Sequence, residues 1–260
     1  MAKVKLTVAY DGTDFHGFSR QPGLRTVQGE LEAAVCRICG TPYEVYGASR
    51  TDAGVHAKKQ VAHIVLDERM QLPIERIGYA LRMQMPRDIV VQDVSRVADQ
   101  FHARHDAMRK VYRYFFATTR APDVFRARYQ MNVPVPLNDE AMRLGAVHLI
   151  GRHDFTSFCF AHAQQESKVR TLHSLEVVRV DEATLYLEVV GKSFLHNMVR
   201  ILAGTLLEVG KGRIPPAQIQ HILASRDRRA AGPTAPARGL TLWDIAYPSD
   251  CDAPVQELSS

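Results

Sequence analysis

Segments with the apolar period of a strand alternate along this chain with segments that have the apolar period of a helix. Every second residue over 4–8 is apolar, and this period of two predicts a strand. Thr26 is a suitable N-cap for a helix that runs to about Cys39, and Gly40 is a suitable stop. Three further strands are predicted over residues 43–48, 60–66 and 89–94, with a polar turn over 49–57 and a helix that starts at Pro73. The order strand, helix, strand, strand, helix, strand is that of a ferredoxin-like unit.

The second half of the chain shows a similar pattern. A strand is predicted over residues 111–117, and Asn138 is a suitable cap for the helix that follows. The remaining predicted elements are a hairpin over 172–180 and 184–190, a helix that includes Phe194 and Met198, a helix that starts at Pro215 and a strand over 240–247. The sequence therefore predicts an α+β protein of two ferredoxin-like αβ units, with domains over residues 1–105 and 106–248 and a polar tail over 249–260.

Composition narrows the class of protein further. The chain has 260 residues, of which 46% are hydrophobic and 23% charged, which excludes a disordered or fibrous protein. Four cysteines are too few for a disulfide scaffold, and no apolar run is long enough to cross a membrane, so a cytoplasmic protein is expected. Cys36 and Cys39 have no partner pair or histidine set at the spacing of a zinc site, so packing is their expected role and no metal is predicted. The net charge of +5 permits a nucleic-acid partner without requiring one.

One polar segment between two predicted strands stands out as a candidate site. It reads Ala-Ser-Arg-Thr-Asp-Ala-Gly-Val-His-Ala over residues 48–57. Arg50, Asp52 and Gly54 can form an ordinary turn, because aspartate bonds nearby backbone groups and glycine takes positive φ. The alternative is a carboxylate that acts as a nucleophile or base. An aspartate in water titrates near pH ~3.9, and a neighbouring cation lowers that pKa, so such a group is ionised at neutral pH. From spacing alone, both interpretations remain open.

The segment resembles the catalytic motif of the TruA family of tRNA pseudouridine synthases. Five other segments resemble the family in the same order, over nearly the whole chain: Tyr10-Asp11-Gly12-Thr13 with Phe15-His16-Gly17-Phe18, Phe101-His102-Ala103-Arg104, Lys110-Val111-Tyr112-Arg113-Tyr114, Ser193 to Arg200, and Thr234 to Leu240. Ser49, Ser19 and His105 depart from the family pattern, which affects fine contacts to RNA and no group that the reaction needs.

The resemblance implies the conversion of uridine to pseudouridine in the anticodon stem-loop of tRNA, at positions 38, 39 and 40. This isomerisation involves no redox change and needs no cofactor. By resemblance, Asp52 is the nucleophile or base, Arg200 pairs with it, and Tyr112 stacks on the uracil and takes the C5 proton. Arg50 is the candidate to occupy the space that the flipped uridine leaves, and Leu240 is a substrate-binding candidate. Tyr114, on the same face of the strand as Tyr112, is expected to pack.

The resemblance also implies a continuous sheet, a central basic cleft for tRNA and a homodimer. The candidate RNA-binding residues surround the motifs in the sequence: Arg20, Lys58, Phe101, His102, Ala103, Arg104, His105, Arg109, Lys110, Ala163, Gln164, Gln165, Glu166 and Ser167. A non-catalytic RNA-binding module is the main alternative, because ferredoxin-like sheets also serve in such modules. Its Gly-Phe-Gly-Phe type signature is missing from this chain. A nucleoside hydrolase is disfavoured, because glycoside hydrolysis usually needs two carboxylates.

Overall fold

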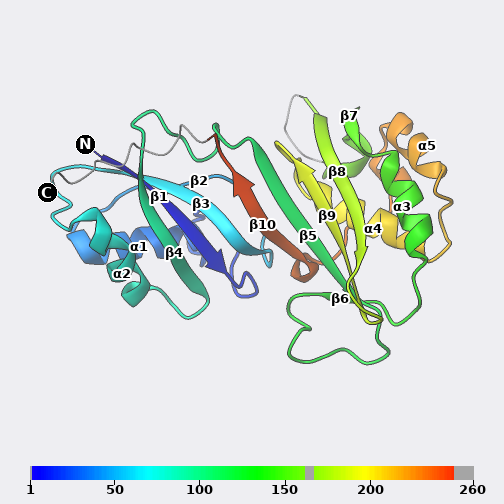
Figure 1. The fold of residues 1–260 in the computed structure, drawn as a ribbon, viewed down its shortest axis with the longest axis horizontal. Coiled ribbons are helices and arrows are strands. Elements are labelled where there is room, and N and C mark those ends of the chain that lie inside the picture. The colour runs from blue at the N-terminus through cyan, green and yellow to red at the C-terminus, as the bar shows by residue number, and fades with distance from the viewer. Residues whose placement is uncertain (1, 162–166, 249–260) are drawn as a thin grey trace, which may run out of the picture. The chain divides into compact units, whose positions relative to one another are not determined.

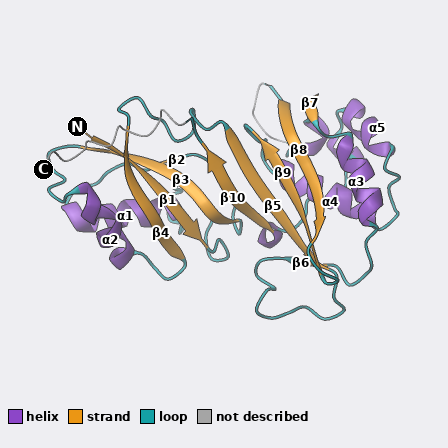
Figure 2. Cartoon of the chain, viewed as in Figure 1, coloured by secondary structure: helices purple, strands orange, loops and turns teal. Residues whose placement is uncertain are grey.

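The computed structural model describes residues 2–161 and 167–248 of the chain. The fold divides into two compact units, one of Met1–Met108 with Ile245–Ser260 and the other of Arg109–Asp244. In Figure 2, strands and helices occur in both units. The predicted α+β class is confirmed. No helix among the described residues has the length and apolar character needed to cross a membrane.

The first unit is built around the N-terminal strand. Its elements are β1 (Ala2–Tyr10), α1 (Val27–Cys39), β2 (Tyr46–Gly47), β3 (His56–Leu66), α2 (Ile74–Gln84) and β4 (Ile89–Val97), as labelled in Figure 1. β1 pairs antiparallel with β3 on one side and with β4 on the other, and β2 pairs with β3. Alternate residues of β1 are buried, from Val4 to Tyr10, and the helices contribute Leu31, Val35 and Leu81 to the same unit's core.

The second unit has more strands than the first, and three α-helices among its described residues. Its elements are β5 (Arg109–Ala117), β6 (Met131–Asn132), α3 (Asp139–Val147), β7 (Gly151–Asp154), β8 (Val169–Arg179), β9 (Thr184–Gly191), α4 (Met198–Gly210), α5 (Gln218–Ser225) and β10 (Leu240–Ala246), the last of which reaches Asp244 within this unit. Its strands lie in the order β10-β5-β9-β8-β7. α3 packs against β8 and α4. α4 is buried at every position except Arg200 and Glu208, as expected of a helix that is apolar on all sides.

Local sequence signals predict several helix ends correctly, whereas two of the predicted elements have different bounds in the structure. The cap predictions at Thr26, Gly40 and Asn138 are confirmed: both polar side chains accept a backbone N–H, and Gly40 has a φ of 75°. The strand predicted over 43–48 forms only over Tyr46–Gly47, which pairs with His63 and Ala62 of β3. Just before it, the N–H of Val45 donates to the Glu32 side chain at 3.2 Å and not to a strand. The prediction that one helix includes both Phe194 and Met198 is wrong for Phe194, because α4 begins at Met198.

Candidate active site

The segment singled out by the sequence forms a tight loop between β2 and β3. Thr51 is buried, Asp52 is half-buried and Arg50 is exposed. The backbone N–H of Val55 donates to the Asp52 carbonyl at 3.1 Å, which closes a turn that Gly54 completes with a φ of 77°. The segment therefore forms the turn that its Asp and Gly predict, and the same turn leaves the Asp52 side chain half-buried.

A second loop, over residues 11–18, braces the Asp52 loop from the side of β1. The N–H of Phe18 donates to the Thr51 carbonyl at 3.1 Å, and the N–H of Gly54 donates to the Phe15 carbonyl at 3.2 Å. Gly17 has a φ of +94°, and a Cβ on it would lie 2.8 Å from the Thr51 carbonyl oxygen. Only glycine combines that backbone conformation with so close an approach. The motif over residues 10–18 therefore supports the backbone of the loop that carries Asp52.

Side chains from other parts of the first unit bond the backbone of the predicted RNA-binding turn after β4. Phe101 and Ala103 are buried, whereas Arg104 and His105 are exposed. Lys3 Nζ donates to the Phe101 carbonyl at 2.7 Å, and the Tyr247 hydroxyl donates to the Ala103 carbonyl at 2.6 Å. The turn is thereby fixed, and it presents a cation and an imidazole to solvent.

Three histidines and a tyrosine form an aromatic cluster at this turn. The ring of His63 stacks on Tyr46 at 5.0 Å and meets the ring of His102 at 4.9 Å, and His102 lies 4.2 Å from His105. Burial lowers the pKa of His63 to about 4, with further lowering by His102 and Lys3. Burial, followed by the neighbouring His105, also lowers the pKa of His102. Both rings are therefore neutral at physiological pH.

The candidate aromatic residues of the second unit lie on β5. Tyr112 is 6% exposed, and its ring meets Phe194 edge-on at 5.0 Å. Tyr114 is fully buried, its hydroxyl donates to the Pro236 carbonyl at 2.8 Å, and burial raises its pKa. The prediction that Tyr114 packs is confirmed. Leu240, the first residue of β10, is 5% exposed.

Arg200 is placed at the start of α4, where it is half-buried as its apolar neighbours predict. Its Nε donates to the Ala235 carbonyl at 2.8 Å, and its Nη1 donates to the Asn197 side-chain oxygen at 2.8 Å. The Ala235 N–H in turn donates to the Arg200 carbonyl at 3.0 Å. The guanidinium therefore has a fixed orientation within its unit, set by the residue before α4 and by the loop before β10.

The other RNA-binding candidates are spread over both units. Arg20 is exposed and pairs with Glu32 at 3.1 Å. Lys58, Arg109 and Ser167 are also exposed, whereas Lys110 is only 7% exposed. Residues 163–166, which hold Ala163, Gln164, Gln165 and Glu166, lie outside the described part of the chain.

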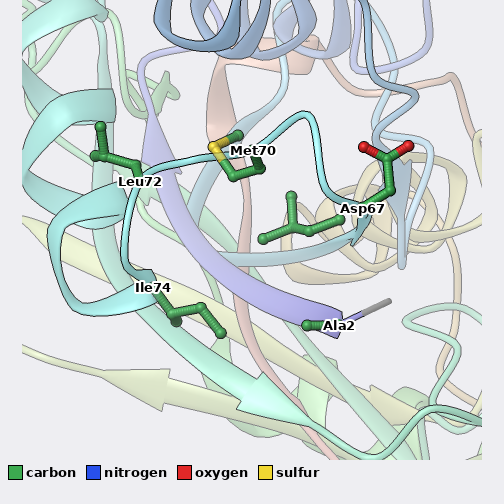
Figure 3. A pocket seen from close by; sticks show the side chains of 6 residues that line it. Ala2, Asp67, Met70, Leu72 and Ile74 are labelled. Carbon is green, nitrogen blue, oxygen red and sulfur yellow. The ribbon is translucent and has the colours of Figure 1, made fainter.

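A cavity of about 290 Å³ in the first unit is lined by none of the candidate residues. Figure 3 shows its lining of apolar side chains and one carboxylate, from Ala2, Leu66, Asp67, Met70, Leu72 and Ile74. That carboxylate accepts hydrogen bonds from the Tyr43 hydroxyl at 2.6 Å and from Arg69 Nε at 2.9 Å. Because the Asp67 carboxylate is already bonded and the other lining side chains are apolar, the cavity offers few groups that could bind a polar ligand. Among residues 2–161 and 167–248, no group of three or more metal-binding side chains could hold an ion.

Comparison with known proteins shows which family the chain belongs to. A family model described as tRNA pseudouridine synthase matches residues 6–106 and 146–248. The chain belongs to the tRNA pseudouridine synthase family. Asp52, Arg200 and Leu240 lie within the matched residues, whereas Tyr112 lies between the two matched ranges.

Individual pseudouridine synthases are similar over almost the full length. The tRNA pseudouridine synthase A of Brevibacillus brevis is 47% identical over 95% of this chain and 100% of its own length. The enzyme of the same name from Bacillus subtilis is 45% identical over 94% of this chain and 99% of its own. Among solved structures, the archaeal box H/ACA sRNP Nop10–Cbf5 complex is similar at a TM-score of 0.36, with 10% identity over 88% of this chain and 59% of that chain.

Sequence reasoning missed two residues that support these pseudouridine synthase motifs. The sequence predicts Gln60 and His63 only as residues of a strand, yet both are buried polar residues of β3. The available signal was their chemistry: two polar side chains among the apolar residues of a strand need buried hydrogen-bond partners. His63 Nδ1 accepts the backbone N–H of Ala103 at 3.2 Å, and the side chain of Gln60 bonds both the N–H and the carbonyl of Ser49 in the Asp52 loop.

Proposed function

We propose that this protein isomerises uridine to pseudouridine in the anticodon stem-loop of tRNA, at positions 38, 39 and 40. The proposal rests mainly on the nearly full-length similarity to enzymes named tRNA pseudouridine synthase A. It is supported by the resemblance of the segment around Asp52 to the family's catalytic motif. The braced loop around Asp52 supports this function, because a reacting carboxylate needs a defined orientation.

Asp52 is proposed as the group that reacts with the target nucleotide. The N1–C1′ bond of the uridine breaks, a C5–C1′ bond forms, and the proton lost from C5 is balanced by one gained at N1. The carboxylate can attack C1′, add to C6 of the uracil, or take the C2′ proton to give a glycal. All three routes conserve electrons and atoms, so the isomerisation requires no redox cofactor and no co-substrate.

The supporting roles belong to residues of both units. We propose that Arg200 pairs with Asp52 and orients it, which suits a guanidinium already held by Ala235 and Asn197. Tyr112 would stack on the uracil and accept the C5 proton through its hydroxyl, and Leu240 would contact the base. Arg50, exposed beside Asp52, would fill the space that the flipped uridine vacates.

The tRNA itself would bind a basic surface. In this proposal the two units are ferredoxin-like, their sheets are continuous, and the central cleft between them is basic. The element order β1, α1, β2, β3, α2, β4 of the first unit supports the ferredoxin-like assignment. Arg20, Lys58, Arg104 and Arg109 are candidate phosphate contacts, and Phe101, His102, Ala103, His105, Lys110 and residues 163–167 complete the proposed RNA surface. A cytoplasmic homodimer is part of the same proposal.

Tritium release tests this function. Purified protein is incubated with tRNA that carries tritium at C5 of uridine, without added metal or nucleotide, and the modified positions are then mapped. The proposal predicts stoichiometric release from the anticodon stem-loop. Binding of tRNA without release would favour a non-catalytic RNA-binding module, and free uracil among the products would indicate a hydrolase.

A further inference from the structure

A fully buried glutamine lies beside the Asp52 loop. Gln60 of β3 has an exposed fraction of 0%. Its Nε2 donates to the Ser49 carbonyl at 2.7 Å and to the Tyr10 hydroxyl oxygen at 3.3 Å. Its Oε1 accepts the backbone N–H groups of Ser49 and Val61, each at 3.2 Å. All of its hydrogen-bonding groups are therefore engaged.

The glutamine side chain extends the sheet into the loop by one residue. The β2–β3 ladder ends at the pair Gly47 and Ala62, and the N–H of Ala48 still donates to the Val61 carbonyl at 2.8 Å. At Ser49 the side-chain amide of Gln60 takes over, because it bonds both the N–H and the carbonyl of that residue. A primary amide presents the same donor and acceptor as a peptide unit, so it substitutes for a missing strand partner.

A second connection runs from Gln60 to the residue next to Asp52. The Tyr10 hydroxyl, which accepts from Gln60, lies 2.8 Å from the Thr51 hydroxyl. Tyr10 and Thr51 are 5% and 6% exposed. Thr51 is therefore held through its side chain by this relay and through its carbonyl by Phe18.

We propose that Gln60 is a positioning residue for Asp52. It acts through Ser49 directly and through Tyr10 and Thr51, and it cannot touch RNA because it has no exposed surface. This inference rests on the proposed function of Asp52. Since displacement of a reacting group by about 1 Å can cost ~100-fold in rate, loss of the amide should slow the chemical step. Binding of tRNA depends on many separate phosphate contacts and should persist.

The test compares variants that disturb this relay with a matched control. Gln60→Glu keeps the shape of the side chain but replaces the amide donor, and Tyr10→Phe removes the hydroxyl that links Gln60 to Thr51. Tyr43→Phe is the control, because Tyr43 is also buried in the first unit (6% exposed) and its hydroxyl bonds Asp67. The single-turnover rate of tritium release should fall about 10- to 100-fold in the first two variants and stay within about 2-fold in the control. The Kd for tRNA should change by less than about 3-fold in all three.

Two further measurements separate positioning from a loss of folding. Thr51→Val should slow the reaction, whereas Thr51→Ser, which retains the hydroxyl, should recover most of the rate. Amide hydrogen exchange of residues 49–55 without RNA should speed up in Gln60→Glu and stay unchanged in Tyr43→Phe. Equal rates for Tyr10→Phe and Tyr43→Phe, or a loss of tRNA affinity with an unchanged rate, would overturn the inference. Inactive wild-type protein would refute the proposed function instead, and the exchange measurement would still test the bracing of the loop.

Discussion

Two histidines hold the turn after Phe101 through ring nitrogens that must be unprotonated. His63 Nδ1 accepts the N–H of Ala103 at 3.2 Å, and His102 Nδ1 accepts the N–H of Arg104 at 3.1 Å. A protonated imidazole has two donors and no acceptor, so protonation of either ring removes one of these bonds. The order of the proposed RNA-binding turn is therefore linked to pH.

The linkage predicts a loss of stability in mild acid. Burial gives His63 a folded-state pKa of about 4, below the value of about 6.5 expected in the unfolded chain. The unfolded chain therefore binds the proton first, and the stability present above pH ~6.5 is lost progressively as the pH falls toward the folded-state pKa. We expect this group to contribute a fall of about 2 kcal/mol in the free energy of unfolding between pH ~7 and ~5. Urea unfolding at a series of pH values measures it.

A matched pair of variants assigns this fall to His63. His63→Asn places an amide oxygen near the Nδ1 position, keeps an acceptor for Ala103 and removes the titration. Its stability should depend less on pH over this range. The same substitution at His221, an exposed histidine of α5, should leave the fall in place. An unchanged pH profile in His63→Asn would contradict the assignment.

At the scale of elements, the contact between the loops over 11–18 and 48–55 depends on Gly17. Gly17→Ala introduces a Cβ at 2.8 Å from the Thr51 carbonyl oxygen as well as an unfavourable positive φ. Gly23 also has a positive φ, of +72°, but a Cβ there would meet nothing within 4 Å. Gly23→Ala should therefore cost about 1 kcal/mol of unfolding free energy, and Gly17→Ala about 2–3 kcal/mol. Equal losses in the two variants would show that the loops can separate without cost.

The sequence predicted elements best where a single residue carries the boundary. Thr26 and Asn138 begin helices because their side chains accept a backbone N–H, and this chemistry is visible in the residue itself. The strand predicted around β2 is too long, and β6 and β7 are not predicted at all, because the extent of these short strands depends on pairing with strands distant in the sequence. Phe194 continues the apolar pattern of α4 in sequence, yet the helix starts only after Asn197, whose φ is 61°.

The candidate site follows the same division between contiguous and distant residues. Arg50, Thr51 and Asp52 share one loop, so a contiguous motif predicts their proximity. Gln60 and Tyr10 reach that loop from two strands, and His63 reaches the turn at Ala103 from forty residues away in the chain. These contacts are set by the strand register of β1 and β3, which no local pattern encodes.

At the scale of the whole molecule, the net charge of +5 says little and the placement of exposed cations says more. Arg104→Ala removes an exposed cation from the turn at residues 101–106. It should weaken tRNA binding and reduce the slope of log Kd against log salt by about 1. Arg76→Ala, at an exposed position of α2 outside the motifs, is the control and should change neither quantity. Titrations at several salt concentrations measure both, and identical slopes for the two variants would remove Arg104 from the RNA surface.

The most direct test of the proposed function is the single-turnover release of tritium from tRNA by Asp52→Asn. The substitution keeps the shape of the side chain and removes the carboxylate that is proposed to react, while the loop bonds formed by Thr51 and Gly54 remain. If Asp52 is the reacting group, the rate should fall by at least about 10⁴-fold, and the Kd for tRNA should stay within about 3-fold of the wild-type value. Release at the wild-type rate by Asp52→Asn would contradict the assignment of Asp52 as the reacting group.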